Sequence, residues 1–240
     1  MKNAVALLAA VFCTLAATAQ QPVTVTIGNG ISTREVREIA AFNKISVFGP
    51  FEVRLVSGNA GKIVVEAEKN LTGLVSTEVE GNVLTIKPQD GKLFKSSKDN
   101  KIIIKVPFET INEIAFKGSG TVSSKKQVQN DLVIKLEGSG SIDLNVASNV
   151  TEAILLGSGN ITIGGKTQTF KCKVVGPGVV KAQELQAAVV DVSISGSGNA
   201  EVHSNEAIKG RISGSGNVAY TGSPRDRDLK RTGTGEFKVD

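Results

Sequence analysis

The sequence predicts an all-β protein that folds as a parallel β-solenoid, or β-helix, with coils of about 19 residues. A Gly-x-Gly triplet recurs seven times between Gly118 and Gly235, and its first glycines are 20, 19, 19, 20, 18 and 19 residues apart. Apolar and polar residues alternate on both sides of the triplets, which is the period of a half-buried strand. Two strands around one tight corner in a near-constant period match one coil of a solenoid.

Residues 1–19 are expected to form a signal peptide. Lys2 precedes a run of apolar or small residues at positions 4–17, broken only by Thr14, and Ala17-Thr18-Ala19 has the small-x-small pattern that a signal peptidase accepts. The run is shorter than the roughly 20 residues of a membrane-spanning helix. We therefore expect cleavage after Ala19, export to the periplasm, cell surface or extracellular space, and no transmembrane span in the mature chain.

The two cysteines have different expected roles. Cys13 lies inside the signal segment and would be the anchor of a lipoprotein. Phe12 before it is bulkier than the residue that usually precedes a lipid-anchored cysteine, so cleavage after Ala19 is favoured over a lipid anchor. Cys172 alternates with Phe170 and Val174. This parity predicts a buried thiol that acts as a small hydrophobic side chain.

A lead-in over residues 20–41 is expected to precede a single domain over residues 42–240. The domain divides into a hairpin-containing part, residues 42–110, and the regular repeats, residues 111–240. Gly49 has apolar neighbours at the same offsets as the triplets, so residues 45–55 predict a first, modified coil.

Two hairpins are predicted after this first coil. Glycine and asparagine residues separate strand-like residues 51–56 from 63–67, and Gly81-Asn82 separates residues 74–79 from 83–87. The polar residues 89–101 are predicted to form a loop.

The triplets predict stacked corners, where glycine accommodates a positive φ. The corner glycines are Gly118, Gly120, Gly138, Gly140, Gly157, Gly159, Gly176, Gly178, Gly196, Gly198, Gly214, Gly216, Gly233 and Gly235. The central residues form a column that a ligand would face: Ser119, Ser139, Ser158, Ser197, Ser215 and Thr234. Pro177 replaces the serine in one corner. The simpler interpretation is that an exposed corner tolerates small residues.

The motifs resemble those of the exported, Bacteroidetes-type family of putative auto-transporter adhesins with a head GIN domain. The resemblance covers roughly residues 42–239. It includes Phe42-x-x-Ile45-x-Val47-x-Gly49, Val79-x-Gly81-Asn82-x-Leu84-x-Ile86 and Ile194-Ser195-Gly196-Ser197-Gly198-Asn199. It implies an exported β-helix-like domain with an adhesive role, and it supplies no catalytic residues.

No metal site, cofactor site or catalytic residue is predicted. One histidine and two cysteines cannot form a zinc cluster. Calcium-binding repeats place an aspartate in every turn, but only Asp143 and Asp191 lie near the corners, at different places. A phosphate-binding glycine loop leads into a helix, and no helix is predicted after any triplet.

Charge and composition limit the kinds of partner that the protein is expected to bind. The net charge is +5, but aromatic residues make up only 4% of the chain, so nucleic-acid binding is not expected. The favoured hypothesis is a non-enzymatic module for adhesion or recognition at the cell envelope, with a glycan or an envelope protein as its partner.

Two alternatives remain open. A polysaccharide-active β-helix enzyme would need two carboxylates close together in an open groove; the sequence offers only dispersed acids and the pair Glu201 and His203, which share strand parity. A structural or assembly module would oligomerise through the strand edges at the solenoid ends.

Overall fold

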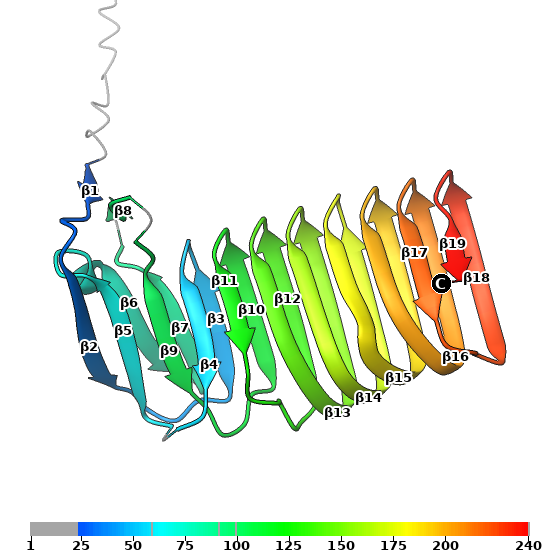
Figure 1. Ribbon diagram of the computed structural model, residues 1–240, viewed down its shortest axis with the longest axis horizontal. Coiled ribbons are helices and arrows are strands. Elements are labelled where there is room, and N and C mark those ends of the chain that lie inside the picture. The colour runs from blue at the N-terminus through cyan, green and yellow to red at the C-terminus, as the bar shows by residue number, and fades with distance from the viewer. Residues whose placement is uncertain (1–23, 59, 91, 99, 240) are drawn as a thin grey trace, which may run out of the picture.

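The computed structural model describes residues 24–58, 60–90, 92–98 and 100–239, and this part of the chain is a β-solenoid (Figure 1). Apart from one 3-10 turn, η1 (Thr72–Leu74), every regular element there is a strand. The predicted fold class is confirmed. The predicted signal peptide and its cleavage site lie outside the described residues.

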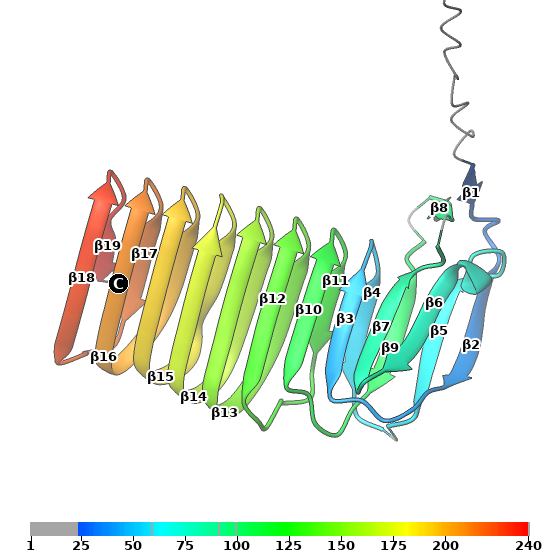
Figure 2. The ribbon, with the colours of Figure 1, turned by 180° about the vertical axis from the view of Figure 1, so that it is seen from behind.

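Ten strands build the regular coils. In chain order they are β10 (Glu113–Gly118), β11 (Thr121–Ser124), β12 (Leu132–Gly138), β13 (Ser141–Gly157), β14 (Asn160–Val175), β15 (Val179–Gly196), β16 (Asn199–Gly214), β17 (Asn217–Thr221), β18 (Asp226–Gly233) and β19 (Phe237–Val239). Figures 1 and 2 show the coils as a row that ends at β18 and β19.

Each triplet joins two opposite walls of the solenoid. We call the strands before the triplets the first wall and those after them the second wall. In β13, residues 141–146 belong to the second wall and pair in parallel with residues 160–165 of β14. Residues 151–156 belong to the first wall and pair with residues 170–175. A single long strand therefore turns from one wall into the other.

The alternation of apolar residues places one ladder of side chains between the walls. One such ladder takes one residue from each successive coil, and every member is at most 3% exposed: Ile114, Ile134, Ala153, Cys172 and Val192. Burying an aliphatic side chain of this size contributes about 1.5–3 kcal/mol. The repeated ladders are thus the main source of stability, and the predicted burial of Cys172 is confirmed.

The part before Gly118 holds the remaining strands. They are β1 (Val25–Ile27), β2 (Ser32–Glu38), β3 (Lys44–Phe48), β4 (Glu52–Val56), β5 (Lys62–Glu68), β6 (Val75–Glu80), β7 (Val83–Pro88), β8 (Leu93–Lys95) and β9 (Ile103–Pro107). β3 pairs in parallel with β10, and β4 with β11. Gly49 between them has φ +116°, like the later corners, so the modified first coil is confirmed.

The N-terminal end adds a further layer to each wall. β7 stacks in parallel on β3 and β9 stacks in parallel on β4. β6 then pairs antiparallel with β7, while β5 pairs antiparallel with both β9 and β2. The predicted hairpin at Gly81-Asn82 is confirmed, with φ +53° and +65° at its turn.

The other predicted hairpin is wrong. β4 and β5 do not pair, because β9 lies between them and occupies the edge of each. The stretch predicted as a loop, residues 89–101, contains the short strand β8, which pairs with β1. In both places a strand pairs with a partner that is distant in sequence, and no local pattern indicates that partner.

Both ends of the solenoid replace apolar core residues by polar or charged ones. Thr33, Glu35 and Arg37 of β2 stand opposite buried residues of β5. Arg227 and Arg231 of β18 continue the ladders that isoleucines hold on β16. Inward charges on an edge strand disfavour pairing with another chain.

Candidate functional site

The corners form a ridge along the solenoid, and their two glycines meet different requirements. The first glycine of each triplet has φ between +108° and +156°; these are Gly118, Gly138, Gly157, Gly176, Gly196, Gly214 and Gly233. The second glycine lies outside this region, but a Cβ there would crowd a main-chain oxygen of the neighbouring coil; these are Gly120, Gly140, Gly159, Gly178, Gly198, Gly216 and Gly235. The first position requires an unusual backbone conformation as well as close approach to the neighbouring coil, and the second requires close approach alone.

The hydroxyl column stands exposed on this ridge at Ser119, Ser139, Ser158, Ser197, Ser215 and Thr234. Four of the six main-chain N–H groups donate to the neighbouring coil, as Ser158 does to the carbonyl of Gly138 at 3.0 Å and Ser215 to that of Gly196 at 3.0 Å; the other two are those of Ser139 and Thr234. Among the described residues, the hydroxyls of the column donate to no other protein group. They form a row with a spacing of about 4.8 Å, interrupted at Pro177.

The described carboxylates, cysteine and histidine include no group of three that could hold a metal ion. Glu201 and His203 do not form the pair that strand parity suggested. Nδ1 of His203 lies 2.8 Å from Oγ1 of Thr221, and Nε2 lies 2.9 Å from Oδ1 of Asn205. Both ring nitrogens are therefore occupied by neutral partners.

Glu52 and Glu66 share an open depression with the buried Glu68. They stand at the same level on either side of β9, since Glu52 of β4 and Glu66 of β5 both pair with Ile103. Burial alone would raise the pKa of Glu52, but hydrogen bonds from Arg54 and Lys101 outweigh it, so this pKa lies below its usual value. A general acid in a glycosidase needs a raised pKa, so Glu52 is suited to ion pairing.

An apolar groove of about 350 Å³ lies on the outer side of the first wall, across β3, β10, β12 and β13. On these four strands, one row of paired residues that face outward consists of Phe48, Lys117, Glu137 and Leu156; we call such a row an outward rung. Phe48 is 40% exposed and Leu156 is 41% exposed, although apolar residues otherwise lie mainly at inward positions. Ala115 leaves the centre of the groove open because its side chain is small.

Ion pairs fix the polar side chains around this groove. Nζ of Lys117 lies 2.8 Å from Oε1 of Glu137, and Nζ of Lys135 lies 2.6 Å from Oε1 of Glu113. The hydrogen bond from Lys135 is the main reason why the pKa of Glu113 lies below its usual value. The lysines are thereby held at the rim, which leaves the apolar floor accessible.

The sequence analysis did not identify this groove. The usable signal was parity: Phe48, Ile154 and Leu156 are apolar at positions that face away from the core. Their proximity depends on the register of β3 with β10, which joins segments about 70 residues apart in sequence.

Comparison with known proteins supports the fold. A putative adhesin from Bacteroides fragilis NCTC 9343 aligns with a TM-score of 0.80 at 24% identity, over 89% of this chain and 99% of that one. A putative lipid binding protein from Parabacteroides distasonis ATCC 8503 aligns with a TM-score of 0.75 at 22% identity, over 90% of this chain and 100% of that one. A putative adhesin from Parabacteroides merdae ATCC 43184 aligns with a TM-score of 0.65 at 22% identity, over 90% and 98%.

No curated protein matches the chain. Within the described residues, no helix is long and apolar enough to cross a membrane. The family model described as putative auto-transporter adhesin, head GIN domain, matches residues 41–224. With more than half of its length covered and the predicted β-solenoid present, the chain belongs to this family.

Proposed function

We propose that this chain is an exported, non-enzymatic recognition module of the cell envelope, and that its apolar groove receives an apolar group of its partner. The observation that carries the proposal is the exposure of Phe48 and Leu156 on the outer side of the wall, beside the charged Lys117 and Glu137. Exposed apolar patches rimmed by polar residues are typical of interaction sites. The adhesin description of the family supports the same role.

The test makes the same substitution, to aspartate, at two outward positions of the first wall. Leu156 lies in the groove, whereas Ser195 lies two coils further along the same outward ladder and is exposed. The chain from Gln20 is immobilised, and retention of envelope vesicles from the producing bacterium is measured. We expect wild type and Ser195→Asp to retain the vesicles and Leu156→Asp to lose at least tenfold. No retention by wild type would refute the adhesive role, and equal retention by both variants would refute the groove.

A second candidate partner is a lipid acyl chain. The apolar floor of the groove favours it, and one protein of similar fold is described as a putative lipid binding protein. Fluorescence of bound cis-parinaric acid tests this candidate directly. Saturable binding that Leu156→Asp abolishes and Ser195→Asp preserves would favour a lipid. Vesicle retention that protease treatment of the vesicles removes would favour a protein partner.

A further inference from the structure

Cationic side chains gather on the outer side of the second wall, near the N-terminal end. They come from β2, β9, β4, the loop before β9 and the loop after β11: Arg34, Arg54, Lys101, Lys105, Lys125 and Lys126. We call these six residues the basic surface. They border two depressions of about 640 and 630 Å³, and both depressions are lined by Arg54.

The register of the wall brings these residues together. Lys105, Arg54 and Ser123 occupy one outward rung on β9, β4 and β11. Adjacent strands are about 4.8 Å apart, so Arg54 and Lys105, 51 residues apart in sequence, become neighbours. Lys125 and Lys126 follow directly after β11. The second depression is lined by four of the cations, two serines and two aliphatic residues, and by no carboxylate.

The carboxylates around the basic surface are too few to neutralise it. Glu52 is shared by Arg54 and by Lys101, whose Nζ lies 3.2 Å away. Glu66 is shared by Lys105 at 2.7 Å and Arg34 at 4.0 Å.

Glu68 also borders the first depression, but it is 2% exposed and accepts hydrogen bonds from Ser97 and Gly30. Six cations therefore face three carboxylates. On the next strand, Asp143 pairs with Ser123, and the basic surface ends at this carboxylate.

Lys126 is held in place before any ligand arrives. Its Nζ donates a hydrogen bond to the carbonyl of Phe108 at 2.7 Å and lies 4.5 Å from the centre of the Phe108 ring. Among the described residues, neither Lys125 nor Lys126 forms an ion pair with a carboxylate. A fixed ammonium group costs less conformational entropy on binding than a free one.

We infer that the basic surface binds an acidic polysaccharide, whose charged groups lie in the two depressions. Arginine and lysine side chains recognise carboxylate, sulfate and phosphate groups through charge-assisted hydrogen bonds. The two depressions run across β2, β5, β9, β4 and β11, a width of about 19 Å at the usual strand spacing, which suits a linear chain better than a single ion. The nearby rings of Phe51 and Phe108 are buried, so neither ring offers a platform on which nucleic-acid bases could stack. The inference goes beyond the proposed function, because it concerns the other wall and a different ligand chemistry.

The test uses one charge reversal inside the surface and a matched one outside it. Lys125→Glu changes the exposed one of the two lysines that form no ion pair among the described residues. Lys181→Glu makes the same change on the ladder of Arg54 and Ser123, three coils beyond Ser123, where the side chain is also exposed. Binding of polygalacturonate and dextran sulfate oligosaccharides is measured by calorimetry, with neutral dextran and single-stranded DNA for comparison.

We expect wild type and Lys181→Glu to bind at least one acidic polymer, and Lys125→Glu to bind it at least fivefold more weakly. Neutral dextran should not bind, and added salt should weaken binding. Equal effects of the two reversals, or no binding of either acidic polymer, would overturn the inference. DNA binding as tight as that of the acidic polymers would replace the polysaccharide by a nucleic acid. Leu156→Asp should leave this binding unchanged, which separates the result from that of the groove.

Discussion

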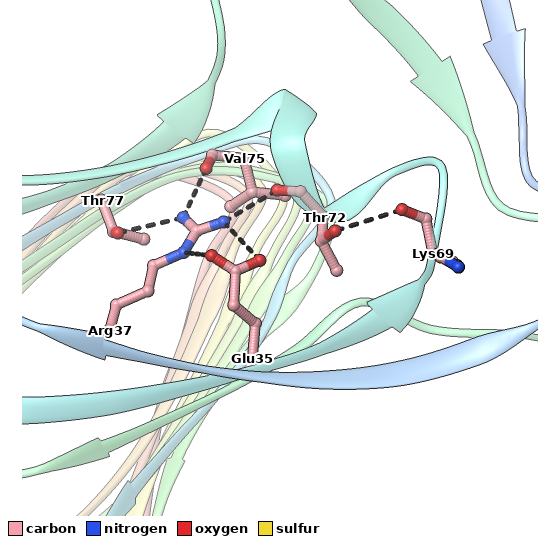
Figure 3. A network of polar contacts seen from close by, with 6 residues as sticks. All are labelled: Glu35, Arg37, Lys69, Thr72, Val75 and Thr77. Atoms are coloured by element: carbon pink, nitrogen blue, oxygen red, sulfur yellow. Dashed lines mark hydrogen bonds and ion pairs between the residues drawn. The ribbon is translucent and has the colours of Figure 1, made fainter.

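Arg37 of β2 donates a hydrogen bond of 2.6 Å to the main-chain carbonyl of Val75, the first residue of β6 (Figure 3). β2 is the edge strand of the second wall and β6 is the edge strand of the first, so this contact closes the N-terminal end of the solenoid. The guanidinium also donates to Oγ1 of Thr77 at 3.1 Å and to the carbonyl of Thr72 at 2.9 Å. Its hydrogen bond to Glu35 is the main reason why the pKa of Glu35 lies below its usual value.

Replacing Arg37 by alanine should open this end of the molecule. Two carbonyls and a hydroxyl would lose a charged donor, and an unsatisfied buried polar group costs about 1–3 kcal/mol. Because solenoid coils contact only their neighbours, the effect should be local. We expect amide hydrogen exchange in β2 and β6 to accelerate at least tenfold, with little change in β14. Arg34→Ala on the outer side of the same strand, 66% exposed, should leave exchange unchanged; similar acceleration in both variants would contradict the closing role of Arg37.

The sequence predicted the regular coils well because their information is local. Each Gly-x-Gly corner and its flanking alternation lie within one period, so Gly196 and the apolar residues around it define a coil without reference to the rest of the chain. The same rule identified the coil around Gly49. Corner glycines and buried ladders therefore need no knowledge of long-range pairing.

The sequence could not predict the N-terminal layer or the two surfaces proposed to bind. β9 inserts between β4 and β5, and the turn between those strands resembles a hairpin turn. The groove needs Phe48 in register with Lys117, and the basic surface needs Lys105 in register with Arg54. Parallel pairing over such distances depends on packing of the whole wall, for which no local pattern exists.

Substitutions at two corner glycines should differ in cost. Gly196 and Gly214 have φ +113° and +127°, and a Cβ in the left-handed region costs about 1–2 kcal/mol. At Gly196 the added Cβ would approach the carbonyl oxygen of Gly176 at 3.3 Å, whereas at Gly214 it would overlap that of Gly196. We expect Gly214→Ala to lower the free energy of unfolding more than Gly196→Ala, as measured by urea denaturation.

The bulkier Gly196→Val should be more destabilising than Gly196→Ala, because a β-branched side chain adds steric strain at the same backbone conformation. The exposed neighbour provides the control: Ser197→Ala should cost less than about 0.5 kcal/mol. A Gly196→Val protein as stable as wild type would show that the corners are not strained, and the ridge would need another explanation.

Cys172 should be chemically inert in the folded protein. Burial raises the pKa of its thiol to about 12, so the reactive thiolate is scarce at neutral pH. A chain beginning at Gln20 should not react with Ellman's reagent under native conditions, and it should release one equivalent of chromophore in urea. At a pH of about 9 the thiol should still be mainly protonated, so labelling of the folded protein should remain far slower than labelling in urea. Rapid labelling of the folded protein would contradict the burial of Cys172.

Glu68 should make the N-terminal end sensitive to acid. Its carboxylate accepts hydrogen bonds from the hydroxyl and the N–H of Ser97 and from the N–H of Gly30, and it joins the segment before β2 to the segment after β8. The hydroxyl of Ser97 is the main cause of a pKa below the ordinary 4.5, with burial opposing it and the two N–H groups assisting. A carboxyl group whose pKa is lowered by folding stabilises the protein above its unfolded-state pKa, and this stabilisation is lost as the pH falls through the folded-state pKa.

The variant Glu68→Gln tests this dependence, because an amide carries no charge and presents a single acceptor oxygen. At neutral pH we expect the melting temperature of Glu68→Gln to lie below that of wild type. As the pH falls from about 5 to about 3, wild type should lose stability faster and the difference should shrink. Glu80→Gln, an exposed change on the β6–β7 hairpin, should follow wild type throughout. A difference between Glu68→Gln and wild type that stays constant with pH would show that the charge of Glu68 does not hold these segments together.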